Sequence, residues 1–185
     1  MRPKSNGMPV IRSFLSHEWR TYKNLRLRAL ADSPDAFGGT LVQEKDRPDT
    51  EWSTRLASGV ASHQDLPLVA ELGTESIGLA WGRIESSHPD VANLYQMWVA
   101  PNYRGLGAGQ MLLESVIAWA SAANMCYLVL NVTCGDSPAL RLYVRAGFQA
   151  VGEPEPLRPG SELLAQPMRL ALRRVIELNS FHSGK

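Results

Sequence analysis

Three apolar or alternating segments follow one another between residues 66 and 99, separated only by short turns. The first turn is Gly-Thr-Glu at residues 73–75 and the second spans residues 86–90, and both are rich in residues that end strands and reverse the chain. Neighbouring strands joined by such short connections pair as an antiparallel meander, because a parallel pair needs a long crossover. The sequence therefore predicts an antiparallel sheet at the centre of the fold. The other elements must extend this sheet or cover it.

The apolar period alternates between that of a strand and that of a helix on both sides of this meander. The expected strands are residues 10–14, 66–72, 76–85, 91–99, 127–132 and 148–151 and a last one from Met168 to about Arg173. The expected helices are residues 17–30, 48–56, 105–123 and 137–146. Proline and glycine predict loops at residues 31–39 and 152–160. The prediction is an α+β fold in which a central mixed, mostly antiparallel seven-stranded sheet carries about four helices.

Length and composition place these elements in one domain. The chain has 185 residues, of which 44% are hydrophobic, and this is enough for a single core without a disulfide or a structural metal. We expect one domain over residues 8–178, with a turn of helix near residues 175–178, and flexible termini at residues 1–7 and 179–185. The 19 basic and 18 acidic residues give a net charge of +1, which argues against a nucleic-acid partner but leaves a small phosphorylated ligand open.

Cys126 and Cys134 are the two cysteines, and they form no Cys-x-x-Cys pair and have no nearby histidine at metal-ligand spacing. We expect reduced thiols and no metal. The basic residues among the first seven have no apolar segment behind them, and no stretch reaches the roughly eighteen apolar residues of a membrane span. The cytoplasm is the expected location, with no membrane partner.

The segment from Val99 to Gly109 joins an expected strand directly to an expected helix, with Gly105 and Gly107 where that helix begins. The free N–H groups of a first helical turn and the positive end of the helix dipole bind anions, and glycines let a pyrophosphate approach the backbone. Arg104 adds a charged, forked donor. The alternative is that the glycines serve only a tight turn from strand to helix.

Two well-known glycine patterns do not fit this loop. A Walker A loop closes on Gly-Lys-Ser/Thr, but Gln110 and Met111 follow Gly109. A dinucleotide-binding fingerprint that starts at Gly105 requires glycine where Gln110 stands. ATP and NAD are therefore disfavoured as ligands.

Arg104, Gly107 and Gly109 fit the Arg/Gln-x-x-Gly-x-Gly/Ala motif, and the chain resembles the GNAT superfamily of acetyl-CoA-dependent N-acetyltransferases in which that motif occurs. A second motif agrees, since Tyr143 lies near the end of an expected helix and a Gly-Phe pair follows at residues 147–148. The order of elements from residue 10 to residue 172 is similar to that of the family, although the motifs themselves cover only residues 93–148. One departure is Asp136, where the family often has asparagine.

The resemblance implies a sheet that is splayed between its two middle strands and acetyl-CoA as the co-substrate bound there, without a metal. It also implies that Tyr143, whose phenol stays protonated at neutral pH, donates a proton to the departing CoA thiolate. The alternative is a buried tyrosine that anchors its helix. The cofactor-binding residues that the resemblance implies are Met97, Trp98, Val99, Arg104, Gly105, Leu106, Gly107, Ala108, Gly109, Asn131, Ser137, Leu140 and Tyr143.

The general base is less clear from the sequence. The family often has a glutamate on the strand before the glycine loop, and Asn93 stands in this chain instead, so we place Asn93 in the catalytic group as a residue that orders a water chain. Glu85 and His88 are the neighbouring candidates, and a solvated position at a strand end is the favoured interpretation of Glu85. The loop at residues 33–40 falls on the acceptor side that the resemblance implies. The aromatic residues on that side, most of them expected in the core, are Trp19, Tyr22, Phe37, Trp52 and Trp81.

The function that follows is transfer of an acetyl group from acetyl-CoA to a primary amine of a small molecule or peptide by direct attack. One alternative is a non-catalytic module that binds acyl-CoA, and another is an interaction domain with no affinity for CoA. An exposed sheet edge at the last strands favours a homodimer. The sequence specifies neither the amine nor the length of the acyl chain.

Overall fold

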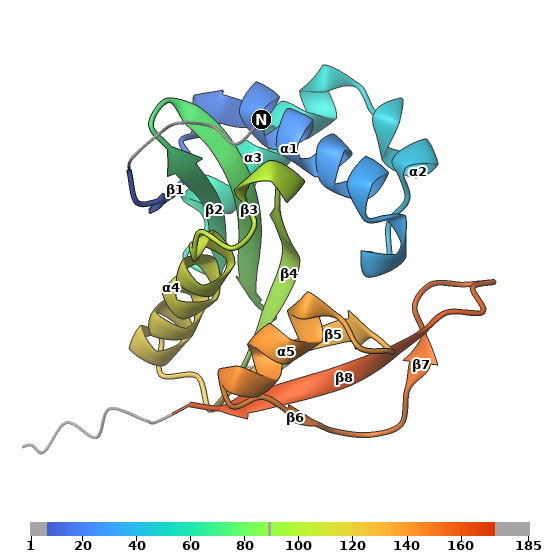
Figure 1. Ribbon diagram of the computed structural model, residues 1–185. Helices are drawn as coiled ribbons and strands as arrows, with labels where there is room; N and C mark the ends of the chain where they lie inside the picture. Colours follow the sequence, from blue (N-terminus) through green and yellow to red (C-terminus); the bar gives the residue numbers. More distant parts are fainter. Residues whose placement is uncertain (1–6, 89, 173–185) are drawn as a thin grey trace, which may run out of the picture.

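The structure is a computed structural model that describes residues 7–88 and 90–172. One eight-stranded sheet runs in the order β1-β2-β3-β4-β5-β8-β6, with β7 beside β8 (Figure 1). The strands are β1 (Val10–Ser13), β2 (Asp65–Leu72), β3 (Glu75–Ile84), β4 (Val91–Val99), β5 (Tyr127–Thr133), β6 (Gln149–Ala150), β7 (Glu155–Pro156) and β8 (Leu164–Ala171). The helices are α1 (Trp19–Asp32), α2 (Leu41–Lys45), α3 (Asp49–Ala61), α4 (Ala108–Ala122) and α5 (Pro138–Arg145), and the 3-10 turns are η1 (Ser16–Glu18), η2 (Pro34–Ala36) and η3 (Pro101–Tyr103).

The first four strands pair antiparallel with their neighbours in sequence order, as their short connections predict. β4 and β5 are parallel, because α4 carries the chain back along one face of the sheet between them. β8 then returns antiparallel to β5, and β6 lies at the far edge. The prediction of a mixed, mostly antiparallel sheet is confirmed.

Among the described residues the sheet has eight strands where seven are predicted, and there are five α-helices where about four are predicted. β7 lies inside the predicted loop at residues 152–160, because β8 begins at Leu164 rather than Met168 and offers an edge with which β7 pairs. α2 lies between the first two predicted helices, where no helix is predicted. Thr40 and Gln43 exchange hydrogen bonds of 3.0 and 3.3 Å at its start, and this capping box stabilises a helix of five residues, too short to show a period.

Some expectations lie outside the residues that the structure describes. These are the turn of helix near residues 175–178 and the termini predicted to be flexible, apart from Gly7. The single domain predicted over residues 8–178 is described only as far as residue 172. Within the described part, all strands belong to one sheet.

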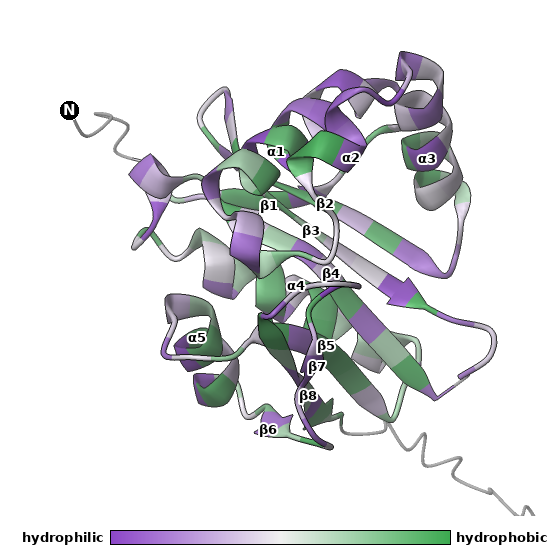
Figure 2. Ribbon diagram, turned by 90° about the vertical axis from the view of Figure 1, so that its right-hand side faces the viewer, coloured by the Kyte–Doolittle hydropathy of each residue, from purple (hydrophilic) through white to green (hydrophobic). Residues whose placement is uncertain are grey.

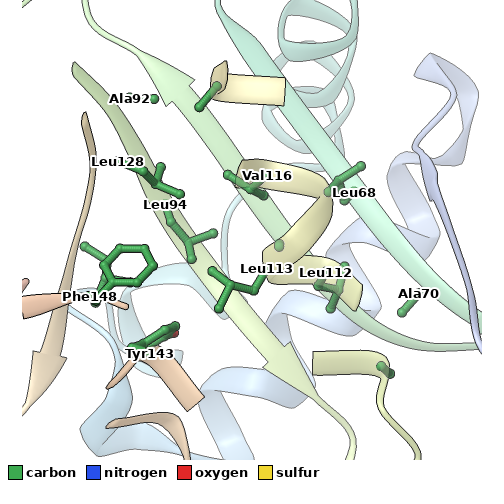
Figure 3. Packing of buried hydrophobic residues seen from close by; sticks show 14 of the residues in the cluster. Leu68, Ala70, Ala92, Leu94, Leu112, Leu113, Val116, Leu128, Tyr143 and Phe148 are labelled. Carbon is green, nitrogen blue, oxygen red and sulfur yellow. The ribbon is translucent and has the colours of Figure 1, made fainter. Parts of the chain in front are cut away.

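Two hydrophobic cores lie on opposite faces of the sheet. α4 and α5 pack on one face, and α1 and α3 pack on the other. In Figure 3, Leu113 and Val116 of α4 lie over the strands, and Tyr143 of α5 and Phe148 lie beside the same core. Figure 2 shows hydrophilic residues on the outer turns of α1, α2 and α3 and hydrophobic residues along the strands. Burial of these apolar side chains, at about 25 cal/mol per Å², is the main term that stabilises both layers.

β4 pairs with β5 only at its start. Three residue pairs join the two strands, and the last of them is Asn93 with Val129. β4 stays paired with β3 to its end, so the two halves of the sheet separate beyond Asn93 and the predicted splay is present. A bulge accompanies the separation, since Gln96 and Met97 of β4 oppose Ala80 of β3, and Gln96 has a φ of 55°, which residues other than glycine rarely adopt.

We predict that Gly59 of α3 resists replacement by alanine. A Cβ at this position would stand 2.4 Å from Cζ2 of the buried Trp81 on β3. Glycine to alanine within a helix ordinarily stabilises by about 1 kcal/mol. We expect Gly59→Ala to lower the free energy of unfolding by about 1–3 kcal/mol instead, because the rigid indole has to move.

Chemical denaturation measures this difference. Ser58→Ala, at an exposed position of the same helix, is the matched control and should be neutral or slightly stabilising. A Gly59→Ala protein that is more stable than the unmodified chain would contradict the close contact between α3 and Trp81.

Candidate active site

The glycine loop at residues 104–109 leads into α4 and leaves the first N–H groups of that helix without helical partners. Gly105 and Gly107 have φ values of 82° and 87°, and Gly107 is the N-cap. The first helical bond runs from the N–H of Met111 to the carbonyl of Gly107 over 3.0 Å, so the N–H groups of residues 108–110 have no acceptor inside the helix. Apart from chain neighbours, no atom lies within 4 Å of the place where a Cβ would stand on Gly105 or Gly107. An anion can therefore approach this backbone closely, and the helix dipole favours one.

Hydrogen bonds to the start of β3 fix the loop in place. The N–H of Ala100 donates to the carbonyl of Ile77 over 2.8 Å. The hydroxyl of Tyr103 donates to the carboxylate of Glu75. The loop is thus positioned by the sheet before any ligand binds, which lowers the entropy that binding would otherwise cost.

Arg104 ties the glycine loop to the end of α1. Its guanidinium forms an ion pair with the carboxylate of Asp32 and donates from Nε to the carbonyl of Val99 over 3.0 Å. The same carboxylate accepts from Trp98 Nε1 over 2.8 Å and from the hydroxyl of Ser33 over 2.7 Å. Partial burial raises the pKa of Asp32, but the three donors outweigh it and the pKa is lowered overall. Asp32 is therefore a stable counter-charge for Arg104, and binding of Arg104 to a phosphate stays a prediction.

Tyr143 lies at the opening between β4 and β5. Its side chain is 7% exposed and packs its ring against Phe148, with centroids 5.8 Å apart. The hydroxyl reaches the sulfur of Met97 on the free part of β4, 3.8 Å away, which is a weak acceptor. Burial raises the pKa of Tyr143 to about 12, so the phenol keeps its proton at neutral pH.

Gly109 faces the same opening from the other side. A Cβ on Gly109 would stand 3.7 Å from the methyl group of Met97 and from Leu142, and 3.8 Å from Val99. The structure thus brings together four of the residues predicted for the site, and they come from β4, α4 and α5: Met97, Val99, Gly109 and Tyr143.

Three further predicted residues of this region differ in how they are placed. Leu106 is 48% exposed at the tip of the loop, and Ala108 is buried in the core under α4. The indole of Trp98 lies on the opposite face of the sheet, where its Nε1–H donates a hydrogen bond to the carboxylate of Asp32. Only the backbone of Trp98 is left to line the opening.

The remaining predicted cofactor residues lie on the β5 side. Ser137 caps α5, because its hydroxyl accepts from the N–H of Leu140 over 3.1 Å. Leu140 is partly buried against the core that also contains Tyr143. Asn131 is exposed on β5 opposite Pro167 of β8. Contacts of these residues with a cofactor stay predictions.

Asn93 precedes Met97, the β4 residue that the hydroxyl of Tyr143 reaches. It occupies the last β4–β5 pair, four positions before Met97 and hence ~13 Å along the strand. The candidate Glu85 accepts a hydrogen bond of 3.1 Å from Tyr95, and burial, followed by this contact, raises the pKa of Tyr95 to about 12. His88 lies 3.0 Å from the hydroxyl of its neighbour Ser87 in the turn. No carboxylate or imidazole among the described residues is joined by a hydrogen bond to Tyr143.

Gln96 is a residue that sequence reasoning missed. Its side-chain oxygen accepts from the hydroxyl of Tyr22 over 3.0 Å, across the interface between α1 and the bulge. Burial raises the pKa of Tyr22, and the charge of Arg55 works against that shift. Glutamine rarely adopts a positive φ, so nothing in the sequence predicts this conformation at Gln96.

The acceptor-side aromatic residues are mostly core, as predicted. Trp52 and Trp81 each pack against Tyr22, with ring centroids 5.6 and 5.4 Å away, and all three residues are 4% exposed or less. The loop at residues 33–40 is held over this side by Arg158, which donates to the carbonyls of Pro34 and Phe37, each over 3.0 Å. The loop is thus fixed to the segment before β8.

The comparisons agree with this geometry. The chain matches the model of the acetyltransferase (GNAT) family over residues 22–148 and belongs to that family. Mycothiol acetyltransferase of Acidothermus cellulolyticus is 26% identical over 141 residues, which are 69% of this chain and 40% of that protein. The chain thus spans about two fifths of the length of this curated relative.

Solved structures match over nearly the whole chain. The Salmonella typhimurium protein yncA, with its cofactor acetyl-CoA, superposes with a TM-score of 0.75 at 17% identity, covering 91% of this chain and 96% of that one. Spermidine N-acetyltransferase of Vibrio cholerae, in complex with CoA and spermine, gives a TM-score of 0.72 at 18% identity, covering 90% of this chain and 96% of that one. At such identities the likeness shows the fold.

Three other properties can be read from residues 7–88 and 90–172. No helix there is long and apolar enough to span a membrane. No three histidine, cysteine or acidic side chains come together there as they would around a metal ion. Cys126 and Cys134 form no disulfide.

We predict that Gly107→Ala weakens the binding of acetyl-CoA by about tenfold or more while the protein stays folded. The φ of 87° makes alanine unfavourable by about 1–2 kcal/mol, and a backbone that relaxes from this strain would shift the N–H groups predicted to bind the anion. Isothermal titration calorimetry measures the dissociation constant.

Gly73→Ala is the matched control, because Gly73 has a φ of 63° and equally open surroundings in the β2–β3 turn. It should lose a similar amount of stability and keep its affinity for acetyl-CoA. Equal affinities of the two variants would contradict the assignment of the loop.

Proposed function

We propose that this chain is an N-acetyltransferase that moves an acetyl group from acetyl-CoA to a primary amine of a small molecule or peptide by direct attack. Membership of the GNAT family supports acetyl transfer. The observation that carries the proposal is the separation of β4 from β5 beside the glycine loop, with the hydroxyl of Tyr143 at the opening.

The residues at the opening fit acetyl-CoA, which supplies the acetyl group in activated form. The N–H groups of residues 108–110 would hold its diphosphate, since they have no helical acceptor and lie beside open glycines. The side chains of Met97 and Val99 would flank the thioester arm. The missing side chain of Gly109 keeps α4 close to both without filling the passage.

The reaction forms a bond between the amine nitrogen and the acetyl carbon and breaks the bond from that carbon to sulfur. The amine therefore loses a proton and the thiolate gains one. Backbone N–H groups of β4 beyond Asn93 have no partner on β5, so one of them is available to stabilise negative charge on the carbonyl oxygen. Tyr143 donates the proton to sulfur, because its raised pKa keeps it protonated and its hydroxyl is held by no strong acceptor.

The amine proton leaves to water on the α1 side of β4. Ala92 and Leu94 face the core under α4, so Asn93 between them projects toward the other face, where Gln96 also lies. These two amide side chains would order the water, as expected for a site without a dedicated base. The cytoplasm and the homodimer stay predictions from the sequence.

The direct test of the proposed function is CoA release with a panel of amines that includes amino acids, peptides, polyamines and aminoglycosides. We expect acetyl-CoA to raise the melting temperature, adenosine alone to leave it unchanged, and at least one class of amine to release CoA. A melting temperature that does not respond to acetyl-CoA would exclude the site. A response without release from any amine would favour a module that only binds acyl-CoA.

We predict that Tyr143→Phe lowers kcat by about 10²-fold and changes the dissociation constant of acetyl-CoA less than twofold. The phenol contributes in the transition state, and its weak contact with sulfur makes its loss nearly neutral for folding. Tyr127→Phe, on β5 beneath Arg169, is the control.

The pH dependence checks the same assignment. An acid acts while it is protonated, so activity supported by Tyr143 would be lost only as the pH rises through about 12. Between pH 7 and 10 the rate should rise or stay level as the amine loses its proton. A falling limb in this range that disappears in Tyr143→Phe would contradict the assignment.

A further inference from the structure

A shallow depression of about 390 Å³ lies beside α3 on the acceptor side. α3 buries Trp52, Leu56 and Gly59 against the sheet, and Arg55 lies at the flank of this buried stripe. The residues that line the depression are Arg47, Thr50, Glu51, Thr54 and Arg55. The mechanism described above uses none of them.

Arg55 lines the depression and also lies near Trp81, which pairs with β4 next to the bulge. Its guanidinium carbon lies 5.8 Å from the centroid of the Trp81 ring, a distance at which the ring face attracts and orients a cation. Trp81 pairs in the ladder with Tyr95, the residue before Gln96, and contacts the ring of Tyr22, whose hydroxyl bonds Gln96. The charge of Arg55 also acts on that hydroxyl. Arg55 therefore lies on the same face of the sheet as the side chain of Gln96, the face from which we propose that the amine approaches.

The lining of the depression keeps a net positive charge. The nearby carboxylates of Glu44, Asp49 and Asp65 are each paired with another cation at 2.7 to 2.8 Å. Glu51 is the acid that lines the depression, and within the described residues no ion pair joins it to Arg47 or Arg55. Two arginines against one glutamate give the lining a formal charge of +1.

Two buried hydrogen-bond donors near Tyr22 are also unsatisfied. Nη1 of Arg26 and Nε1 of Trp52 have no hydrogen-bond partner among the described residues. Both residues lie next to Tyr22, one a turn further along α1 and the other in ring contact at 5.6 Å. The charge of Arg26 is paired with Glu44, so these two atoms add unsatisfied hydrogen-bond donors and no net charge. The acceptor side of the bulge thus has an excess of donors over acceptors.

We infer that Arg55 binds a carboxylate of the acceptor, so that the acceptor is an amino acid or another primary amine that carries a carboxylate. This inference rests on the proposed function. The planar fork of a guanidinium matches a carboxylate in two parallel hydrogen bonds, and Trp81 holds the fork in place. The hydroxyls of Thr50 and Thr54 are available to the rest of the molecule. A polyamine would bring further cations toward Arg47 and Arg55 and is disfavoured.

Acid and amide forms of the same amine test the inference, because they differ only in the carboxylate. The pairs are L-alanine, β-alanine, 4-aminobutyrate and L-alanyl-L-alanine, each against its primary amide, with spermidine as the polyamine. We expect at least one acid to exceed its amide by about tenfold in kcat/KM, corrected for the neutral fraction of the amine. Spermidine should be poorer than that acid.

Variants of Arg55 test whether this residue causes the preference for acids over amides. Arg55→Gln should bring the ratio of acid to amide to about one and leave the dissociation constant of acetyl-CoA unchanged, and Arg55→Lys should keep part of the ratio. Arg20→Gln is the matched control, since Arg20 stacks over Trp19 at 4.2 Å on the exposed side of α1 and should not change the ratio.

The outcomes separate the inference from the function on which it rests. Amides or spermidine that react as well as the acids would overturn the inference and leave the acetyltransferase intact. A preference for acids that survives Arg55→Gln would equally overturn it. No CoA release from any amine would overturn the proposed function and the inference together.

Discussion

The departure of β4 from β5 after three residue pairs is the constraint on which the rest of the structure depends. A strand that leaves its neighbour gives up ladder hydrogen bonds, and backbone groups near the interior are unfavourable without partners. The bulge at Gln96 follows this departure along β4, and the hydroxyl of Tyr22 donates a hydrogen bond to the Gln96 side chain from the α1 side. Backbone donors are therefore gathered at an opening between two packed cores, which suits a ligand that can pair with them.

The two faces of the sheet carry different parts of the proposed site. The glycine loop, Gly109 and Tyr143 belong to the face under α4 and α5, where a thioester and its diphosphate would lie. The arginine of the depression and the buried aromatic residues belong to the face under α1 and α3, where an amine would enter. The ion pair of Arg104 with Asp32 crosses from the loop to α1 and links the two regions. Packing on either face thus affects both halves of the site.

Sequence reasoning worked best where the cause is local. The glycine loop before α4 was predictable because glycine spacing and a strand-to-helix switch act between adjacent residues. The resemblance named Tyr143 and Asn93 as catalytic residues, and both roles stay predictions; the structure places Tyr143 next to Met97 and Asn93 at the last β4–β5 pair. Helix α2 and strand β7 were missed, because five and two residues are too short to show a period. Arg55 gave no signal, since an arginine on a helix is ordinarily solvated.

The sequence by itself determined the order of the elements, the meander and the glycine-capped start of α4, because periodicity, turns and caps depend on residues close together in the chain. Only the tertiary structure decided how far β4 and β5 stay paired and which charges meet. Tyr22 and Gln96 are 74 positions apart, and Asp32 and Arg104 are 72 apart. Such contacts form only when the elements on both faces of the sheet pack together. The local pattern of one segment does not indicate which distant segment it will contact.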